Sequence, residues 1–449
     1  NQKIYEILAK AYGKVGKNID AELTYRQLIV LVPNNADFYN DYGVIRSNQK
    51  ASDHIIDLKK AVYLNPLLNN PYNNQGIYFY QKRKYFDSIN RYKKAIILKP
   101  GQNESYNNLA TSQKEVGRPA RGEINLIRAL ILKPKYIEAI ENLINIKVQQ
   151  SENRKLDILI SNYMNSFIWK HLTLRASCLS LIYYFIKAEY TQTKYFLVEI
   201  DKGMKTEKFS SLSEVNQNFV SSYYNYIRQL MLQVPKFSPG KDTSILYHVG
   251  ESHCLSYAHQ LITVQEKKHK VQPKIILGAK AWHLGSPINN GYKSFFRDLC
   301  EDIPPGSQVF LSFGEIDCRS DEGILDHCGK YNKSIKDVVV QTVKNYVKFV
   351  SLSAFAQTCN LYFLGIPAPV LGAANKLPLS DLDRSVISVV RLFNAELKRY
   401  TARYGAKYLD IYSFTSNEYG MSNGQFNCDN RHLSPKAIDR INNLLSQNN

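Results

Sequence analysis

The sequence has little that would tie it to a membrane or to an oxidising compartment. Its 449 residues include no run of 18 apolar residues, so no transmembrane helix is expected. The N-terminus, Asn1 to Ile4, shows no basic segment followed by an apolar run, so no secretory signal is expected, although residues before Asn1 could have been removed. The seven cysteines form no CxxC pair, and their odd number argues against a closed disulfide framework. These absences predict a cytoplasmic protein without a membrane span.

Acidic residues are few, since 39 Asp and Glu stand against 58 Lys and Arg and leave a formal net charge of +19. Such a balance favours association with polyanions. The densest basic cluster, Lys267 to Lys270, is short, and no basic helix, zinc finger or aromatic RNA-binding signature accompanies it. We therefore interpret the cluster as a solvated surface and expect no nucleic-acid partner.

The spacings of His, Cys and carboxylate residues that mark zinc or calcium sites are also missing, so we predict no metal and no cofactor. What is present is an ordinary globular composition, with 44% hydrophobic and 22% charged residues. A chain of 449 residues is about three times the usual domain size, so at least two folded domains are expected.

Four prolines indicate an internal repeat. Pro33, Pro66, Pro100 and Pro134 are spaced by 33, 34 and 34 residues, and each closes a similar phrase, such as Leu98-Lys99-Pro100. Because the residue before a proline is disfavoured in the α region, each phrase is expected to end a helix.

Aromatic and small residues recur at fixed positions before these prolines. Before Pro100 they are Tyr72, Gly76, Tyr92 and Ala95. The corresponding positions of two other repeats hold Tyr106, Ala110, Leu126 and Ala129, and Tyr5, Ala9, Tyr25 and Leu28. The pattern resembles the tetratricopeptide repeat (TPR) over residues 1–148. The resemblance implies stacked helical hairpins that form a curved solenoid, whose concave face binds a protein or peptide.

Paired asparagines are expected near this concave face, namely Asn73, Asn74, Asn107 and Asn108. They could clamp an extended peptide backbone, or they could simply reflect an Asn-rich sequence. Residues 149–240 keep helical periodicity without the repeat signature, as in Leu156 to Ile160, and are interpreted as a degenerate helical extension and linker. The pattern changes near Lys236 to Lys241, so a further domain is expected at 241–449.

This last region alternates short apolar runs with longer segments. The strand-like runs are Ile245 to Val249, Lys274 to Leu277, Gln308 to Phe313, Leu361 to Ile366 and Tyr408 to Ile411. A helix is expected from His253 to Val264. The predicted fold class is thus an all-α TPR solenoid followed by a three-layer α/β/α, flavodoxin-like domain with a parallel sheet of about five strands.

In such a sheet, functional residues collect where strands end. Gly250-Glu251-Ser252-His253 follows the first run, Gly314 to Arg319 follows the third, and Asp429 to Pro435 lies beyond the fifth. These blocks resemble the SGNH, or GDSL-like, hydrolase family over about residues 244–445. The resemblance implies Ser252 as the nucleophile, Asp429 as the acid and His432 as the base, with the oxyanion glycine at Gly278.

The residue types suit this chemistry by themselves. A serine hydroxyl becomes a useful nucleophile when an imidazole accepts its proton and a carboxylate orients that imidazole. Asp429 and His432 are three residues apart, so the acid can reach its own histidine. Taken alone, Ser252 would be read as a helix N-cap, but the three blocks together favour a site.

One position departs from the family pattern, because Ile316 stands where the oxyanion Asn belongs. A missing oxyanion donor costs roughly 3 to 4 kcal/mol of transition-state stabilisation. Arg319 is the candidate substitute, and the alternative is an ion pair that stiffens the loop, with Asp317 as a possible partner. Glu315 and Asp317 share this loop and are expected near the site.

Two further residues leave alternatives open. His253 could contact substrate or be structural, and Trp282 could stack on a sugar ring or pack in the core. The sequence therefore predicts a serine-dependent ester hydrolase or acyl-transfer enzyme. O-acylated carbohydrate is the substrate class that the resemblance implies, with the repeats recruiting a protein partner. The alternative is a catalytically weak or inactive domain in a TPR binding scaffold.

Overall fold

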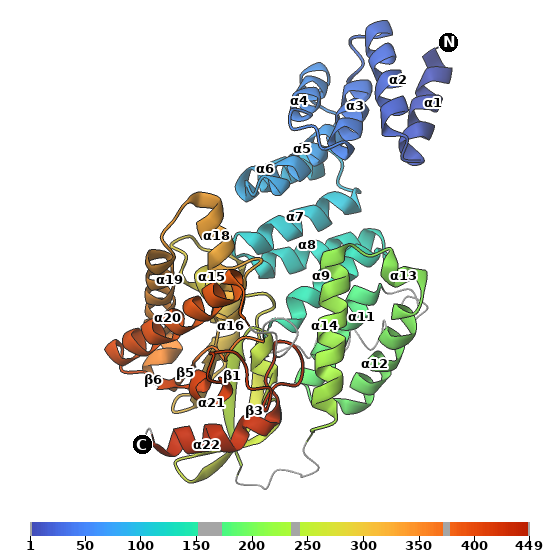
Figure 1. Ribbon diagram of the computed structural model, residues 1–449. Helices are drawn as coiled ribbons and strands as arrows, with labels where there is room; N and C mark the ends of the chain where they lie inside the picture. The colour runs from blue at the N-terminus through green and yellow to red at the C-terminus, as the bar shows by residue number, and fades with distance from the viewer. Residues whose placement is uncertain (1, 151–172, 235–242, 371–377, 448–449) are drawn as a thin grey trace. The chain divides into compact units, whose positions relative to one another are not determined.

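The computed structural model describes residues 2–150, 173–234, 243–370 and 378–447 (Figure 1). The chain divides into two compact units, Asn1–Leu143 and Ile144–Asn449. The predicted helical segment at Leu156 to Ile160 and the predicted boundary at Lys236 to Lys241 lie outside the described residues.

The first unit is an array of helical hairpins (Figure 1). Its helices are α1 (Gln2–Lys14), α2 (Asn18–Leu31), α3 (Ala36–Asn48), α4 (Ile55–Leu64), α5 (Asn69–Gln81), α6 (Tyr85–Leu98), α7 (Asn103–Glu115), α8 (Pro119–Leu132) and the first part of α9 (Ile137–Val148). The second helix of each of the four hairpins ends two residues before one of the four repeat prolines, as predicted.

The repeat positions pack as the sequence indicates. Ala95 and Tyr92 of α6 are buried, and Gly76 of α5 lies so close to Tyr92 that an added Cβ would stand 2.5 Å from its ring. Ala110, Leu126 and Ala129 of the next hairpin are fully buried. The N-terminal part is therefore a TPR-like helical repeat array.

The paired asparagines form hydrogen bonds between successive repeats. Asn74 Nδ2 donates to Asn40 Oδ1 at 2.8 Å, and Asn142 Nδ2 donates to Asn107 Oδ1 at 2.9 Å. Asn73 Oδ1 accepts from the buried Ser105 hydroxyl at 3.0 Å. These amides thus connect neighbouring repeats, a role that the sequence did not suggest.

The second unit contains a helical part and a sheet. Its described helices and 3₁₀ turns are the end of α9, α11 (Leu174–Ile186), α12 (Tyr190–Met204), α13 (Glu207–Ser210), α14 (Glu214–Met231), η2 (Ser252–Leu255), α15 (Ala281–Gly285), α16 (Gly291–Glu301), α17 (Glu315–Cys318), α18 (Ile324–Tyr331), α19 (Ile335–Ser351), η3 (Ala354–Gln357), α20 (Asp381–Arg403), α21 (Ile411–Thr415), η4 (Pro435–Ala437) and α22 (Ile438–Gln447). None of the helices in the described ranges combines the length and hydropathy needed to cross a bilayer.

The sheet has six strands in the order β2-β3-β1-β4-β5-β6. They are β1 (Ser244–Gly250), β2 (Leu261–Val264), β3 (Lys267–Ile275), β4 (Gln308–Ser312), β5 (Asn360–Leu364) and β6 (Lys407–Leu409). All neighbouring pairs are parallel except β2 and β3, which are antiparallel. The C-terminal region is therefore α/β with a mostly parallel sheet.

The antiparallel edge corrects two expectations. The predicted helix from His253 to Val264 is absent, because its end forms β2 and its start is only the short turn η2. The physical reason is a tight hairpin, in which Gln265 and Glu266 both have positive φ and turn β2 directly into β3. Strand β3 consequently begins at Lys267, seven residues before the predicted start at Lys274.

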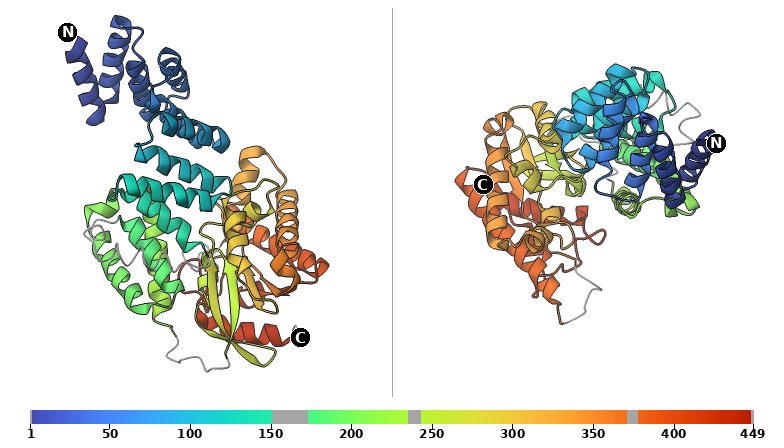
Figure 2. Two further views of the ribbon diagram at one scale, coloured as in Figure 1. Left: turned by 180° about the vertical axis from the view of Figure 1, so that it is seen from behind. Right: turned by 90° about the horizontal axis from the view of Figure 1, so that it is seen from above.

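Both faces of the sheet are covered. On one face, Phe313 and Phe363 pack against Tyr346 of α19, and Phe313 also contacts Phe296 of α16. On the other, Ile441 and Leu445 of α22 join a core cluster with strand residues Leu246, Phe310 and Tyr362. Figure 2 shows α22, in red, beside the strands. The carboxyl ends of β1 and β4 are thereby held between packed layers, where the candidate site lies.

Candidate functional site

The site is built where β1 and β4 end. Gly250 closes β1 and is paired with Ser312, the last residue of β4. A Cβ at Gly250 would collide with the side chain and backbone of Ser312, so the close approach of the two strand ends requires glycine there. The chain then turns through Glu251 into η2, which begins at Ser252.

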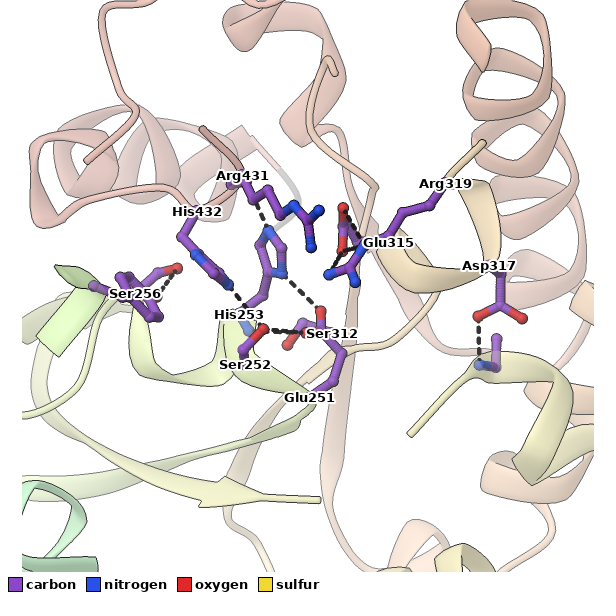
Figure 3. A network of polar contacts seen from close by, with 12 residues as sticks. Glu251, Ser252, His253, Ser256, Ser312, Glu315, Asp317, Arg319, Arg431 and His432 are labelled. Carbon is purple, nitrogen blue, oxygen red and sulfur yellow. Dashed lines mark hydrogen bonds and ion pairs between the residues drawn. The ribbon is translucent and has the colours of Figure 1, made fainter. Parts of the chain in front are cut away.

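Three of the predicted residues form a continuous hydrogen-bonded chain. His432 Nε2 lies 2.8 Å from Ser252 Oγ (Figure 3), and His432 Nδ1 lies 2.7 Å from Asp429 Oδ2. Asp429 Oδ1 also accepts from the backbone N–H groups of Arg431 and His432. Burial acts to raise the pKa of Asp429, but the hydrogen bonds and charge of His432 outweigh it, so this pKa is lowered and the carboxylate stays ionised.

Glu251 is a further member of the site that the sequence reading did not single out. Its Oε2 accepts from the Ser252 hydroxyl at 2.7 Å, and its Oε1 lies 2.7 Å from His253 Nδ1. Burial favours a higher pKa for Glu251, but the His253 charge and these hydrogen bonds lower it to about 2. Burial likewise favours a lower pKa for His253, yet the Glu251 charge raises it to about 9. At neutral pH the two side chains are a buried ion pair.

The Ser252 hydroxyl has one proton and two acceptors within reach, Glu251 Oε2 and His432 Nε2. When the hydroxyl donates to Glu251, His432 must donate its Nε2–H to Ser252 Oγ and is doubly protonated, because its Nδ1–H faces Asp429. When His432 is neutral, its Nε2 can accept the serine proton instead. The geometry thus permits two proton arrangements around one oxygen atom.

Tyr226 contacts the site from α14, far from the three blocks in sequence. Its ring stacks on the His432 imidazole, with centroids 3.9 Å apart and an interplanar angle of 12°. Its hydroxyl lies 2.9 Å from Ser256 Oγ, and burial raises its pKa well above the ordinary value. The stack and the Asp429 hydrogen bond together fix the plane of the imidazole. The sequence contained no signal for this residue.

The loop after β4 supplies an ion-pair cluster. Gly314, with φ of 126°, starts this loop, and a side chain there would collide with Phe393. Arg319 donates from Nε and Nη2 to Glu315, and from Nη1 to Glu322 at 2.7 Å. The guanidinium therefore binds Glu315 and Glu322, whereas the sequence offered Asp317 as the possible ion-pair partner. Ile316 is buried.

Asp317 lies away from Ser252 and serves another element. Its two carboxylate oxygens accept from the backbone N–H groups of Ala281 and Trp282 at 2.7 and 3.0 Å, which caps α15 (Figure 3). Burial raises its pKa to about 6. The Trp282 side chain is 51% exposed, so the core-packing alternative is wrong. Gly278 follows β3 at an exposed turn with φ of 68°.

One group of side chains has the composition of a metal site. Donor atoms of Glu251, His253 and Glu315 lie within 4.8 Å of one another. Each carboxylate is already paired, Glu251 with His253 and Glu315 with Arg319. A cation would have to displace both pairs and sit beside the Arg319 charge. These residues therefore fit a metal poorly, and they fit the observed ion pairs well.

A cavity of about 220 Å³ opens beside this cluster. Its lining includes the polar residues Arg319, Asp321, Asn430 and Arg431 and the apolar residues Ile366, Pro367 and Val390. Asn430 and Arg431 lie between Asp429 and His432 in the chain, and Figure 3 shows the Arg431 side chain extending toward Glu315. The cavity can hold a small molecule with both polar and apolar parts.

Comparisons with known proteins find similarity to solved structures alone. No protein-family model matches the chain, and no curated protein sequence matches it. Among solved structures, PilF of Pseudomonas aeruginosa is 14% identical with a TM-score of 0.41, over 49% of this chain and 96% of that one. The type IV pilus biogenesis factor PilW is 16% identical with a TM-score of 0.42, over 46% of this chain and 96% of PilW. YrrB, described as a TPR protein with an unusual peptide-binding site, is 16% identical with a TM-score of 0.34, over 41% of this chain and 94% of YrrB.

Proposed function

We propose that the C-terminal α/β region is an SGNH-like serine hydrolase that cleaves or transfers ester-linked acyl groups, and that the repeat array recruits a protein partner. The observation that carries the proposal is the chain from Asp429 through His432 to Ser252. Its 2.7 Å link joins Asp429 to His432, and its 2.8 Å link joins His432 to Ser252, which lies 180 positions away in the sequence. The order of the five parallel strands, β3-β1-β4-β5-β6, supports a doubly wound, flavodoxin-like arrangement.

In the proposed reaction, neutral His432 takes the Ser252 proton on Nε2 while Oγ bonds to the ester carbonyl carbon. The tetrahedral intermediate then collapses, His432 gives the proton to the departing alcohol, and the acyl group remains on Ser252. Water or an acceptor hydroxyl completes the cycle by the reverse proton path. Asp429 holds the imidazole with Nδ1–H toward its carboxylate throughout.

Glu251 competes with His432 for the serine proton, and His253 limits this competition. The positive His253 ring binds the other oxygen of Glu251 and neutralises part of its charge, which weakens the carboxylate as an acceptor. His253 is therefore proposed as a positioning residue for Glu251, rather than as a contact to substrate.

The oxyanion would be held by backbone groups, since Ile316 offers no side-chain donor. Within the described residues, neither the Ser252 N–H nor the Gly278 N–H has an acceptor. Ser252 and Gly278 leave the adjacent strands β1 and β3 at the same edge, where Ile276 N donates to Gly250 O. With the pairs formed by Arg319 intact, Arg319 would orient Glu315 instead of binding the oxyanion.

The substrate class is proposed to be O-acylated carbohydrate. The cavity of about 220 Å³ supports it, because Asp321, Asn430 and Arg431 offer the hydrogen-bonding groups that sugar hydroxyls need. The apolar lining residues Ile366 and Pro367 can contact a short acyl group.

Labelling of the full chain with a fluorophosphonate probe tests the proposal. Ser252→Ala should abolish labelling, and Asp429→Asn should slow it by several powers of ten. Ser434→Ala is the matched control, because Ser434 is also buried, lies two residues after His432 and has a hydroxyl without a partner in the described residues. A folded wild-type chain that takes up no label would contradict the proposal.

The alternative function is a binding scaffold with little turnover. The Ser252 hydroxyl donating to Glu251 and the apolar Ile316 favour it. In that case Ser252→Ala would leave binding of a protein partner unchanged, whereas Asn108→Arg in the repeat array would weaken it. Hydrolysis of acetylated oligosaccharides by the wild-type chain, lost in Ser252→Ala, would count against this alternative.

A further inference from the structure

A second cavity, of about 280 Å³, lies in the same unit and shares no lining residue with the Ser252 site. Four lysines line it: Lys147 at the end of α9, Lys187 just after α11, and Lys270 and Lys274 on β3. None of its described lining residues is acidic. Lysines from three separate parts of the chain therefore converge on one space.

Two of these lysines are buried. Lys147 is 8% exposed and Lys274 is 7% exposed, whereas most lysines stay in solvent. A buried ammonium group is costly unless negative charge compensates it. Asp298 of α16 supplies part of this charge, since both lysines act to lower its pKa against the larger raising effect of burial. The described lining of the cavity itself contains four lysines and no acidic side chain.

The remaining two lysines stand at its rim. Lys187 is exposed and Lys270 is half-buried. Lys270 and Lys274 lie four residues apart on β3, so their side chains share a face and their Cα atoms are about 13 Å apart. Long flexible stems let such amines approach a common ligand from different directions. His259, which also lines the cavity, has a pKa lowered to about 4 by burial and adds no charge at neutral pH.

We propose that this lysine-lined cavity is a binding site for a small soluble molecule that carries linked phosphate groups. Several ammonium groups spread around one cavity match several linked anionic groups better than a single charge. The site accounts for part of the basic character of the chain. Lys270 lines the cavity, whereas Lys267 and Lys268 of the same strand are exposed and are not lining residues.

Isothermal titration of the full chain with sodium pyrophosphate, at ionic strength held constant with sodium chloride, tests the site. We expect saturable binding of one pyrophosphate per chain. Lys187→Gln and Lys270→Gln should each weaken it about tenfold or more, because each removes a charge-assisted contact. Lys268→Gln is the matched control, with the same change of charge on the same strand, and should bind like the wild type.

Sodium sulfate at the same ionic strength tests the need for linked groups and should bind at least about tenfold more weakly than pyrophosphate. Absence of saturable pyrophosphate binding by the wild type overturns the proposal. A loss of pyrophosphate affinity in Lys268→Gln equal to that in Lys187→Gln and Lys270→Gln overturns it as well. So does a wild-type affinity for sulfate equal to that for pyrophosphate. Thermal unfolding in sodium chloride verifies that each variant is folded, and two rim lysines provide independent variants should one be unstable.

Discussion

The ring of Tyr226 lies flat against the imidazole of His432, at a centroid distance of 3.9 Å. Helix α14 thus contributes directly to the site formed by the sheet. The contact predicts different outcomes for two substitutions. Tyr226→Phe keeps the stack and loses the hydrogen bond to Ser256, which should cost about 1 kcal/mol of stability.

Tyr226→Leu loses the stack as well. Aromatic stacking contributes about 0.5 to 1.5 kcal/mol, so the rate of fluorophosphonate labelling should fall up to about tenfold. Tyr226→Phe should label nearly as fast as the wild type. Equal rates for the Leu and Phe variants, measured on folded protein, would show that the ring does not orient His432.

The Glu251–His253 pair predicts an unusual histidine titration. Glu251 raises the pKa of His253 from 6.5 to about 9, so the stability that His253 contributes is fully present below pH 6.5 and is lost as the pH rises through about 9. Glu251, whose pKa falls from 4.5 to about 2, contributes stability above pH 4.5 that is lost as the pH falls through about 2.

Glu251→Gln should lower the pKa of His253 markedly, because burial then acts with less opposition. NMR titration of histidine ring signals in the full chain measures this change. Glu266→Gln is the control, since it removes one exposed carboxylate in the β2–β3 turn. A His253 pKa that stays near 9 in Glu251→Gln would contradict the ion pair.

Arg319 is predicted to stabilise the loop after β4. It holds Glu315 through two nitrogens and Glu322 through the third, and its side chain is 16% exposed. Arg319→Ala should lower the free energy of unfolding by about 2 kcal/mol, since hydrogen bonds to a charged group are lost. Arg319→Lys should lower the free energy of unfolding by a large part of the same amount, because lysine lacks the planar guanidinium group.

Urea denaturation gives the stability, and labelling per folded molecule gives the reactivity. If Arg319 only positions Glu315, both variants should lose stability and keep most of their reactivity. A similar large loss of reactivity in both variants, with unchanged stability, would instead indicate the oxyanion role that the sequence suggested.

Close helix packing in the repeat array is testable at Gly76. A Cβ there would stand 2.5 Å from the Tyr92 ring, so Gly76→Ala should destabilise the protein by about 1 to 3 kcal/mol. A Cβ added at Gly329 of α18 would have no heavy atom within 4 Å. Gly329→Ala should therefore stabilise the protein by about 0.5 to 1 kcal/mol, because alanine has the higher helix propensity. Thermal unfolding of both variants distinguishes packing from propensity, and a stabilised Gly76→Ala would contradict the packing.

The sequence determined the features that depend on local chemistry. Repeat prolines stop helices because of their own sterics, so the ends of α2, α4, α6 and α8 could be predicted. The three strand-end blocks could be found because the residues of each are contiguous. The separation of Asp429 and His432 by three residues already allowed the contact between them.

Only the tertiary structure decided the rest. Tyr226 of α14 reaches His432 through packing that no local pattern encodes. A helix is predicted from His253 to Val264, but its last four residues form β2 and pair with the beginning of β3. The sequence pattern places the start of β3 at Lys274 instead of Lys267, so it does not reveal this partner strand. Ser252 has two proton acceptors because Glu251 and His432, 181 positions apart, meet at one hydroxyl where β1 ends. The distances between these side chains depend on how the sheet and the helices pack together, and the spacing of residues in the sequence does not reveal that packing.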